Sequence, residues 1–572
     1  MEQTQTEVRV DAKLGGRMND EAIQANCLKA FADALASAGV AHAVLSPGSR
    51  SAPLIIALGQ HQKLQAHSVI DERSAAFLAL GMGKADGLPA IVACTSGTAA
   101  ANLAPAVHEA REAGTPLVAI TADRPPELRA AGENQTIDQV GVFGSAAKQL
   151  DPPPFDAGTP GLWAEFVQTV VEASLRPSPG PVHVNMPLWD PLAAGADANP
   201  IDAKVDRVPA VTSQPVPTAE IDAGCLVVVA GRDEYGFDDG LAETADALGI
   251  PVLADPLSPA ANWKSANVIE NWDSILRVGS WAESHRPDVI LRTGDLPTSK
   301  PLREWIKACS QSGTRVVHFD PLDSRRDPIL ANTAHHAFPI TPSLRGAPQG
   351  DAAWLGEWVA ADARASAAKR QAIDTFSLIS EPAVCEALTV AMTSAEVLFI
   401  SASMPVRDLE SFGHLKNGPR SFANRGANGI DGTIATAAGH AIASGQPTSL
   451  VLGDVSFAHD VSSLASLRKV TTPFLTLVIN NGGGAIFDGL PIAGQKDVYD
   501  EFVFTDPKLN IAAACSAWGL SHRVIATADD VGEAWRQAQG QTSPLIAEVV
   551  VAREASPQAR ESIRAAVAAA LA

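Results

Sequence analysis

The stretch that decides the fold is GDVSFAHDVSSLASLRKVTTPFLTLVINNGGGAIFDGLP, residues 453–491. It joins two apolar runs, SLVLGD and TPFLTLVIN, through a helical segment, DVSSLASL (residues 460–467), so the pattern predicts strand, helix, strand and then a glycine-rich turn. Asp454 and Asn481 each stand where one of these buried parallel strands ends. Because ligands of open α/β sheets bind beyond the carboxyl ends of the strands, we expect both side chains to reach one crevice.

The predicted crevice offers the oxygen ligands that Mg²⁺ prefers. The Asp454 carboxylate, the Asn481 amide and the carbonyl of Gly483 could share an ion with the phosphates of a ligand. Gly482, Gly483 and Gly484 would let the backbone approach a diphosphate closely. Alternatively, GD and NNGGG are two ordinary turns. Their presence in one βαβ unit favours a binding site.

These residues resemble the signature of the thiamine diphosphate enzymes, in which GD is followed one strand later by N or NN. Val455 stands where that family often has glycine, a departure that leaves the ligand Asp454 in place. By this resemblance Asp454, Asn481 and the Gly483 carbonyl hold Mg²⁺ or Mn²⁺, which fixes the diphosphate of thiamine diphosphate. The other residues of this stretch that the resemblance assigns to the cofactor are Gly453, Val455, Ser456, Gly484, Ala485, Ile486 and Phe487.

Length and charge limit the classes of protein to which the chain can belong. At 572 residues it is too long for one core, and we expect about three domains. The formal net charge of −21 would repel nucleic acid and anionic membranes, so local arginines must meet any acidic substrate. With no apolar leader and no apolar run of membrane-spanning length, we expect a cytoplasmic protein without membrane insertion. The six cysteines lack metal-ligand spacing, and we expect them to be buried small hydrophobes.

The first third of the chain carries polar turns between strands and helices. SPGSRSAPL places Ser49 and Arg50 at a helix N-terminus, which suits an anion, although Arg50 could equally be a solvated surface charge. TSGTAAAN places Thr95 and Gly97 before a second helix.

Three further polar residues follow strands or lie in loops of the same region. Glu72 ends the predicted strand SVIDE and opens an apolar helix, where its carboxyl could stay protonated or bond to a neighbouring base. The alternative is a glutamate that caps this helix. Arg124 follows the strand PLVAITA, and Gln135 lies in a loop from which its amide could bind a cofactor ring or a carboxylate.

The family is identified from motifs that follow one another along the chain: SPGSRSAPL, DER, TSGTAAAN, TADRPPEL, ENQTIDQ and NRGANGIDGT. They resemble the 2-succinyl-5-enolpyruvyl-6-hydroxy-3-cyclohexene-1-carboxylate synthase family, the thiamine diphosphate enzymes of menaquinone biosynthesis. The resemblance is close in both terminal thirds and loose in the middle third. It implies an α/β fold of three doubly wound domains with mostly parallel sheets.

The expected parts are a pyrimidine-binding domain (residues 18–195), a linker (196–220), a middle domain (221–346), a helical connector (347–380) and a diphosphate- and metal-binding domain (381–572). No GxGxxG motif occurs in the middle domain, so we expect no dinucleotide site there.

The resemblance also implies a reaction, the transfer of a ketonic group. In it, 2-oxoglutarate is decarboxylated on thiamine diphosphate, and the resulting succinyl carbanion adds to isochorismate. Glu72 would hydrogen-bond the aminopyrimidine ring and so promote loss of the C2 proton. Because Glu72 and the metal ligands belong to different domains, the cofactor would bridge them across the interface of a homodimer or homotetramer.

Both substrates are dicarboxylates, and the resemblance assigns a set of donors to them. The residues expected to act in catalysis are Glu72, Arg50, Gln135, Ser403 and Arg407, and those expected to bind substrate are Ser49, Arg50, Arg124, Lys300, Ser403 and Arg407. Thr95, Gly97, Arg425 and Ile430 are expected at the cofactor, with Arg425 also a candidate for substrate carboxylates.

Our hypothesis gives Arg407 and Ser403 to the distal carboxylate of 2-oxoglutarate, and Arg50, Arg124 and Lys300 to isochorismate. Pro301 follows Lys300 where many family members have arginine, which puts a two-residue clamp in doubt.

Two other functions remain open on the sequence. One is another thiamine diphosphate decarboxylase or carboligase, such as an acetolactate-forming enzyme, which would act on small monocarboxylic oxo acids. The other is a cofactor-binding regulatory protein without catalysis.

Overall fold

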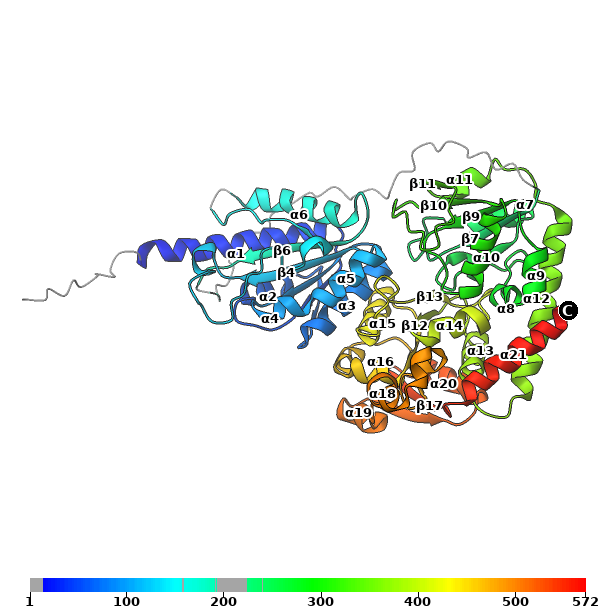
Figure 1. Ribbon diagram of the computed structural model, residues 1–572. Helices are drawn as coiled ribbons and strands as arrows, with labels where there is room; N and C mark the ends of the chain where they lie inside the picture. Colours follow the sequence, from blue (N-terminus) through cyan, green and yellow to red (C-terminus); the bar gives the residue numbers. More distant parts are fainter. Residues whose placement is uncertain (1–13, 157–158, 191, 193–223, 239) are drawn as a thin grey trace, which may run out of the picture. The chain divides into compact units, whose positions relative to one another are not determined.

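The computed structural model describes residues 14–156, 159–190, 192, 224–238 and 240–572. The described residues form two compact units: one lies within residues 1–79, 88–111 and 115–209, and the other within residues 80–87, 112–114 and 210–572. Three parallel sheets alternate with helices along the sequence (Figure 1), which confirms the predicted α/β class. None of the helices in these described ranges has the length and apolar character needed to cross a membrane.

The first unit is built on a six-stranded sheet with the strand order β2-β1-β3-β4-β6-β5. Its strands are β1 (His42–Leu45), β2 (Gln65–Ser68), β3 (Ala90–Cys94), β4 (Leu117–Asp123), β5 (Lys148–Gln149) and β6 (Pro181–Pro187). The helices between and around them are α1 (Leu14–Ser37), α2 (Ala52–Gly59), α3 (Glu72–Asp86), α4 (Thr98–Asn102), α5 (Ala104–Ala113) and α6 (Pro160–Leu175). The central strands β3 and β4, AIVAC and LVAITAD, are buried throughout, as expected for parallel strands covered on both faces.

The strand order of this sheet reverses between β1 and β3, because the chain passes from β1 outward to β2 and then returns to the other side of β1. At such a reversal the loops after the two strands part and leave a crevice. The loops after β1 and β3 carry SPGSR and TSGT. They touch at Gly48, where an added Cβ would lie 2.3 Å from the Cβ of Thr95, so the contact requires glycine.

The second unit contains two further sheets. The five-stranded sheet has the order β11-β10-β9-β7-β8. Its strands are β7 (Leu226–Ala230), β8 (Val252–Ala254), β9 (Val289–Thr293), β10 (Arg315–Phe319) and β11 (Ala334–His336). The helices of this part are α7 (Leu241–Leu248), α8 (Trp272–Leu276), α9 (Gly279–Ser284), α10 (Lys300–Gln311), α11 (Thr341–Leu344) and α12 (Ala352–Thr375). Alternate residues of β7 enter different hydrophobic clusters, so both faces of this sheet are covered.

The last sheet has six strands in the order β13-β12-β14-β15-β17-β16. Its strands are β12 (Val397–Ile400), β13 (Arg420–Phe422), β14 (Thr448–Gly453), β15 (Phe474–Asn480), β16 (Ser521–Ile525) and β17 (Leu545–Val550). Its helices are α13 (Glu381–Ala391), α14 (Met404–Phe412), α15 (Thr433–Ser444), α16 (Asp454–His459), α17 (Leu464–Leu467), α18 (Lys496–Tyr499), α19 (Ile511–Ala517), α20 (Asp529–Gln539) and α21 (Ala555–Leu571). Its order reverses between β12 and β14, so a crevice is expected beyond these two strands.

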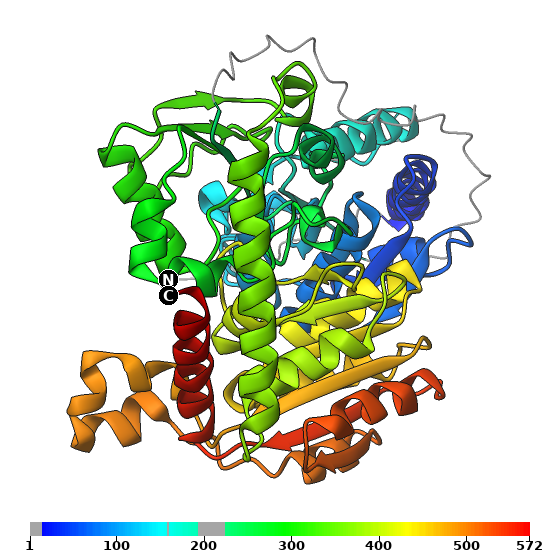
Figure 2. The same cartoon turned by 90° about the vertical axis from the view of Figure 1, so that its right-hand side faces the viewer.

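Helices α12 and α21 run side by side within the second unit (Figure 2). Trp358 and Ala361 of α12 and Ile563 and Val567 of α21 are buried in the same hydrophobic cluster. The last helix of the chain is thereby held against the helix that leads from the second sheet to the third.

Expectations about the linker, the connector, the domains and the cysteines can be compared with this architecture. The predicted linker, residues 196–220, lies outside the described residues. The predicted connector, residues 347–380, contains α12, but the division into three domains stays a prediction. Four cysteines are buried as expected, whereas Cys225 and Cys385 are only half-buried.

Candidate functional site

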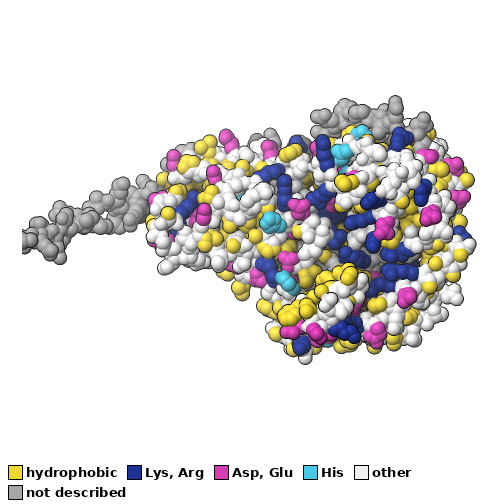
Figure 3. Space-filling view, in the orientation of Figure 1, with side chains coloured by type: hydrophobic (Ala, Val, Ile, Leu, Met, Phe, Trp, Pro, Cys, Tyr) yellow, Lys and Arg dark blue, Asp and Glu magenta, His cyan; other side chains and the backbone are white. Residues whose placement is uncertain are grey.

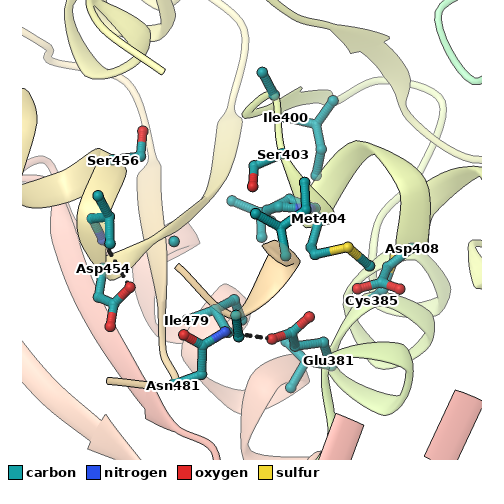
Figure 4. Close-up of a pocket in the computed structure, with 18 of the residues that line it drawn as sticks. Glu381, Cys385, Ile400, Ser403, Met404, Asp408, Asp454, Ser456, Ile479 and Asn481 are labelled. Atoms are coloured by element: carbon teal, nitrogen blue, oxygen red, sulfur yellow. Dashed lines mark hydrogen bonds between the residues drawn. The ribbon is translucent and has the colours of Figure 1, made fainter. Parts of the chain in front are cut away.

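The glycine-rich stretch lies at the carboxyl ends of β14 and β15, as its pattern predicted. Gly453 ends β14 and Asp454 opens α16, while β15 ends at Asn480 immediately before Asn481. The two strands are hydrogen-bonded neighbours, with Gly453 paired to Ile479. Asp454 and Asn481 consequently line the same pocket (Figure 4). One detail was predicted wrongly: the helix begins at Asp454 itself rather than at residue 460.

Two oxygens of this pocket are buried without a hydrogen-bond partner in the described part of the chain. One is Oδ2 of Asp454, whose Oδ1 accepts a bond from the backbone N–H of Val455 at 2.7 Å. The other is Oδ1 of Asn481, whose Nδ2 donates to Oε1 of Glu381 at 2.8 Å. Burial raises the pKa of Asp454 to about 6, against the opposing effect of nearby backbone N–H groups. Unpaired buried oxygens are costly, so the arrangement favours a bound cation.

The turn after Asn481 has a backbone that favours glycine. Gly482 has a φ of +82° and Gly483 a φ of +150°. A Cβ on Gly483 would lie 2.7 Å from the carbonyl oxygen of Phe504, to which the N–H of Gly484 donates at 2.5 Å. The carbonyl of Gly483 accepts one bond, from the N–H of Ala485 at 2.9 Å, and keeps a lone pair for another partner.

The donors of this pocket fit a magnesium ion that is shared with a diphosphate. A carboxylate oxygen, an amide oxygen and a carbonyl are hard ligands, and Mg²⁺ in such sites takes its remaining ligands from phosphates and water. No group of three or more His, Cys, Asp or Glu in the described ranges could hold a metal by itself. The glycine turn leaves the backbone open where a diphosphate would lie.

The reversal between β12 and β14 adds the polar residues that follow β12. Ser403, with a φ of +78°, precedes α14 and lines the same pocket as Asp454. Arg407, one turn into α14, donates from Nη1 to the carbonyl of Ser403 at 2.5 Å. Arg425 donates to Oγ1 of Thr298 at 3.0 Å. Burial lowers the pKa of both arginines, which favours a negatively charged partner beside them.

Lys300 and Arg303 lie on α10 in different surroundings. The side chain of Lys300 is 84% exposed and pairs with Glu304 at 3.5 Å, so this structure does not bring it to the pocket. Arg303 lies close enough to Arg407 for its charge to lower the pKa of Arg407, and it lines one hollow together with Arg425. Lysine and arginine side chains gather on the face of the second unit that Figure 3 shows, although the chain as a whole is acidic.

The first unit brings together several of the predicted polar residues beyond β3 and β4. Arg124 donates from Nη1 to Oγ of Ser96 at 2.5 Å and from Nη2 to the carbonyl of Asn134. Gln135, with a φ of +55°, donates from Nε2 to the carbonyl of Ser96 at 3.1 Å. Thr95 and Gly97 flank Ser96 in the same turn.

Arg50 and Arg124 form a cationic pair within this unit. Arg50 donates from Nη1 to the carbonyl of Leu188 at 2.9 Å and to Oδ2 of the exposed Asp190 at 3.2 Å. The Nε atoms of Arg50 and Arg124 are buried without a partner among the described residues. Burial, together with the charge of Arg50, lowers the pKa of Arg124. Two neighbouring guanidinium groups, each with a buried Nε that has no partner among the described residues, fit the carboxylates of an acidic ligand.

Glu72 is the first residue of α3, but it does not cap that helix. The cap is Asp71, whose Oδ1 accepts from the N–H of Arg73 at 3.0 Å and whose Oδ2 accepts from Oγ of Ser74 at 3.1 Å. The predicted strand also ends earlier, at Ser68. Glu72 is half-buried, and its charge adds to burial in raising the pKa of Cys94, the last residue of β3. The side-chain cap is thus made by Asp71, while Glu72 stands in the first turn of the helix.

Four residues of the pocket or its border were missed by the sequence analysis: Glu381, Arg303, Asp408 and Arg560. Asp408 and Glu381 line the pocket, and Arg560 binds both of their carboxylates. Burial beside Asp408 raises the pKa of Glu381 to about 7. No motif joins these residues, because only tertiary packing brings α13, α14 and α21 together. The roles assigned to the predicted site residues stay predictions.

Comparisons with known proteins agree with this geometry. Residues 25–142 match the family described as "Thiamine pyrophosphate enzyme, N-terminal TPP binding domain", and residues 408–549 match "Thiamine pyrophosphate enzyme, C-terminal TPP binding domain". The chain is 36% identical to the 2-succinyl-5-enolpyruvyl-6-hydroxy-3-cyclohexene-1-carboxylate synthase of Nostoc sp., over 90% of this chain and 92% of the relative. It is 32% identical to the synthase of the same name from Listeria monocytogenes, over 97% of this chain and 99% of the relative. The chain belongs to the 2-succinyl-5-enolpyruvyl-6-hydroxy-3-cyclohexene-1-carboxylate synthase family of thiamine diphosphate enzymes.

Proposed function

We propose that the chain removes CO₂ from 2-oxoglutarate with the aid of thiamine diphosphate and Mg²⁺ and joins the remaining succinyl unit to isochorismate. The product is 2-succinyl-5-enolpyruvyl-6-hydroxy-3-cyclohexene-1-carboxylate, the compound that names the relatives. The observation that carries the proposal is the pair of buried oxygens of Asp454 and Asn481, which lack a hydrogen-bond partner among the described residues and lie beside a glycine turn. The chain also matches these relatives over nearly its whole length.

The residues that would hold the metal are Asp454, Asn481 and Gly483, through one carboxylate oxygen, one amide oxygen and one carbonyl. The backbone of residues 453–456 and 483–487 would border the diphosphate. Thiamine diphosphate, when bound, supplies the carbon nucleophile and the electron sink that side chains lack. Mn²⁺ can replace Mg²⁺ at such oxygen ligands.

We assign to Glu72 a hydrogen bond to the aminopyrimidine of the cofactor. Through this bond the carboxyl group of Glu72 would hold and transfer a proton. Its support is that Asp71, and not Glu72, caps α3. Glu72 belongs to the first unit, whereas Asp454 and Asn481 belong to the second. We propose that the chain self-associates and that Glu72 of one copy completes the site of another.

The basic residues would bind the carboxylates of the two substrates. Arg407 and Ser403 are assigned to the distal carboxylate of 2-oxoglutarate, because both lie at the reversal of the last sheet. Arg50 and Arg124 are assigned to isochorismate, since their Nε atoms have no partner in the described ranges and offer further donors. Lys300 keeps its predicted role as a third donor, although its side chain is largely exposed.

The proposal is tested by supplying the protein with Mg²⁺, thiamine diphosphate and carboxyl-labelled 2-oxoglutarate or pyruvate, with and without isochorismate. We expect labelled CO₂ from 2-oxoglutarate, at a rate that rises on addition of isochorismate, and formation of the coupled product. Release of CO₂ from pyruvate alone would contradict the proposal and favour an acetolactate-forming type of enzyme.

A further inference from the structure

The side-chain amide of Asn481 must present its oxygen, and not its NH₂ group, to a metal ion. The two ends of an amide are nearly equal in size, so packing alone distinguishes them poorly, and hydrogen bonds decide the orientation. In this structure Nδ2 of Asn481 donates to Oε1 of Glu381 at 2.8 Å, and Oδ1 lies on the opposite side, toward Asp454 (Figure 4). Within the described chain, this is the one side-chain hydrogen bond that Asn481 makes.

Glu381 is itself firmly held. It opens α13, and its backbone N–H donates to Oγ of Ser556 at 3.0 Å. Its Oε2 accepts from Nη2 of Arg560, whose Nε donates to Oδ1 of Asp408 at 2.8 Å. The side chains of Glu381, Arg560 and Asp408 are 8%, 11% and 3% exposed. Since Ser556 and Arg560 both lie on α21, the last helix of the chain fixes the acceptor that faces Asn481.

We propose that Glu381 is a positioning residue for the metal site: its carboxylate, held by Arg560, accepts the NH₂ group of Asn481 and so directs the amide oxygen toward the cation. The inference rests on the proposed function, in which Asn481 is a metal ligand. Partners that orient metal ligands commonly contribute about 10- to 100-fold to metal affinity.

The test measures binding of Mn²⁺ to the full-length protein in the presence of thiamine diphosphate, by the electron paramagnetic resonance signal of free Mn²⁺. In Glu381→Gln, the new side chain can turn its oxygen to Arg560 and its NH₂ to residue 481, which would reverse the Asn481 amide. We expect the dissociation constant for Mn²⁺ to rise about 10- to 100-fold. Glu386→Gln, a half-buried change on the same helix, is the matched control and should bind as the wild type does.

A second pair of variants keeps the test decisive if Glu381→Gln also weakens the fold. Asn481→Asp would place two carboxylates together and should bind Mn²⁺ poorly. Combining it with Glu381→Gln gives the new aspartate a donor on one oxygen and leaves the other for the metal, so the double variant should regain most of the lost affinity. A merely structural role of Glu381 predicts additive losses instead.

The outcomes separate the two proposals. If the wild type shows no Mn²⁺ binding that depends on thiamine diphosphate, the proposed function fails. If the wild type binds and Glu381→Gln binds equally well, or if the double variant is no better than Asn481→Asp, the positioning role is overturned while the proposed function stands.

Discussion

Asp71 and Glu72 are neighbours at the start of α3 with different surroundings. Asp71 uses both carboxylate oxygens to bind the first turn of the helix. Because Asp71 makes this cap, Glu72 can face elsewhere, and it lies near the carboxyl end of β3. Asp71 therefore fixes the start of the helix without engaging the carboxylate of Glu72.

Asp238 gives a prediction about pH and stability. Burial, with Asp233 nearby, raises its pKa to about 7, so the folded protein binds a proton more tightly than the unfolded chain does. The stabilisation from this proton is complete below the unfolded pKa of about 4 and is lost as the pH rises through about 7. The Asp238→Asn variant has no carboxyl group to ionise at this position, so it should not lose stability as the pH rises through about 7. Its free energy of unfolding should therefore exceed that of the wild type by about 1 to 3 kcal/mol at about pH 8.5.

The measurement is chemical denaturation of both proteins between about pH 5.5 and about pH 8.5. Asp374→Asn, a change of an exposed residue on α12, is the control and should leave the pH dependence unchanged. A difference between Asp238→Asn and the wild type that does not grow with pH would rule out this account of Asp238.

The positions of Asp454, Asn481, Arg124 and Ser403 were predictable from the sequence because each follows a buried strand. Parallel strands bring their carboxyl ends to one edge of a sheet. Glu381 was not found, since it stands 100 positions from Asn481 and 179 from Arg560 and meets them only through packing. The exposed position of Lys300 depends on how α10 turns, which no local pattern shows.

At the scale of elements, the three sheets differ in what lies beyond the two strands at which the strand order reverses. In the first and last sheets, the loops after the two strands at the reversal carry the predicted polar residues. In the middle sheet the reversal lies between β7 and β9, where Arg232 bridges Asp295 and pairs with it at 2.8 Å. A Cβ on Gly231 would lie 2.0 Å from the carbonyl oxygen of Asp295, so backbone fills this crevice.

The glycine turn is tested by Gly483→Ala. The φ of +150° and the 2.7 Å approach to the Phe504 carbonyl leave no room for a Cβ. We expect the turn to shift, at a cost of about 1 to 3 kcal/mol, and thiamine diphosphate to bind at least about tenfold more weakly. Isothermal titration calorimetry with Mg²⁺ present measures the affinity.

Gly489→Ala is the matched control for this turn, because a Cβ there meets nothing within 4 Å. It should bind the cofactor as the wild type does. Equal affinities for wild type and Gly483→Ala would show that the close packing of the turn is irrelevant to binding.

The types and order of the main strands and helices were predictable, and the details of their ends were not. Long apolar runs such as LVAITAD and FLTLVIN identify buried strands. The end of β2 at Ser68 and the start of α16 at Asp454 depend on tertiary contacts that the local sequence does not encode. Strand order was likewise open, because the apolar pattern does not say beside which strand a new one will pair.

At the scale of the whole molecule, the proposed shared site predicts complementation between two inactive variants. Glu72→Gln removes the carboxylate of the first unit and Asp454→Ala a metal ligand of the second. If each site combines one copy's Glu72 with another copy's Asp454, a mixed dimer keeps one intact site and should show about half the wild-type activity. Mixed dimers are purified through two different affinity tags after co-expression, and their rates are compared with those of each variant alone.

Activity no higher than that of the separate variants would mean that each site is built within one chain. Size-exclusion chromatography with light scattering supplies the assembly state in the same experiment. The predicted division into three domains could be tested alongside, by limited proteolysis between the units.

Membership of the family could be predicted from the sequence because its motifs lie in both terminal thirds of the chain, and the match over nearly the full length of the relatives agrees.

The most direct test of the central claim is the exchange of the C2 proton of thiamine diphosphate with deuterated water, measured by proton magnetic resonance on the protein with Mg²⁺. According to this claim, the carboxylate of Glu72 activates the cofactor that the metal ion anchors. The wild type should accelerate exchange strongly, and Glu72→Gln should bind the cofactor with similar affinity while exchange slows by at least about 100-fold. Exchange at the wild-type rate in Glu72→Gln would contradict the account.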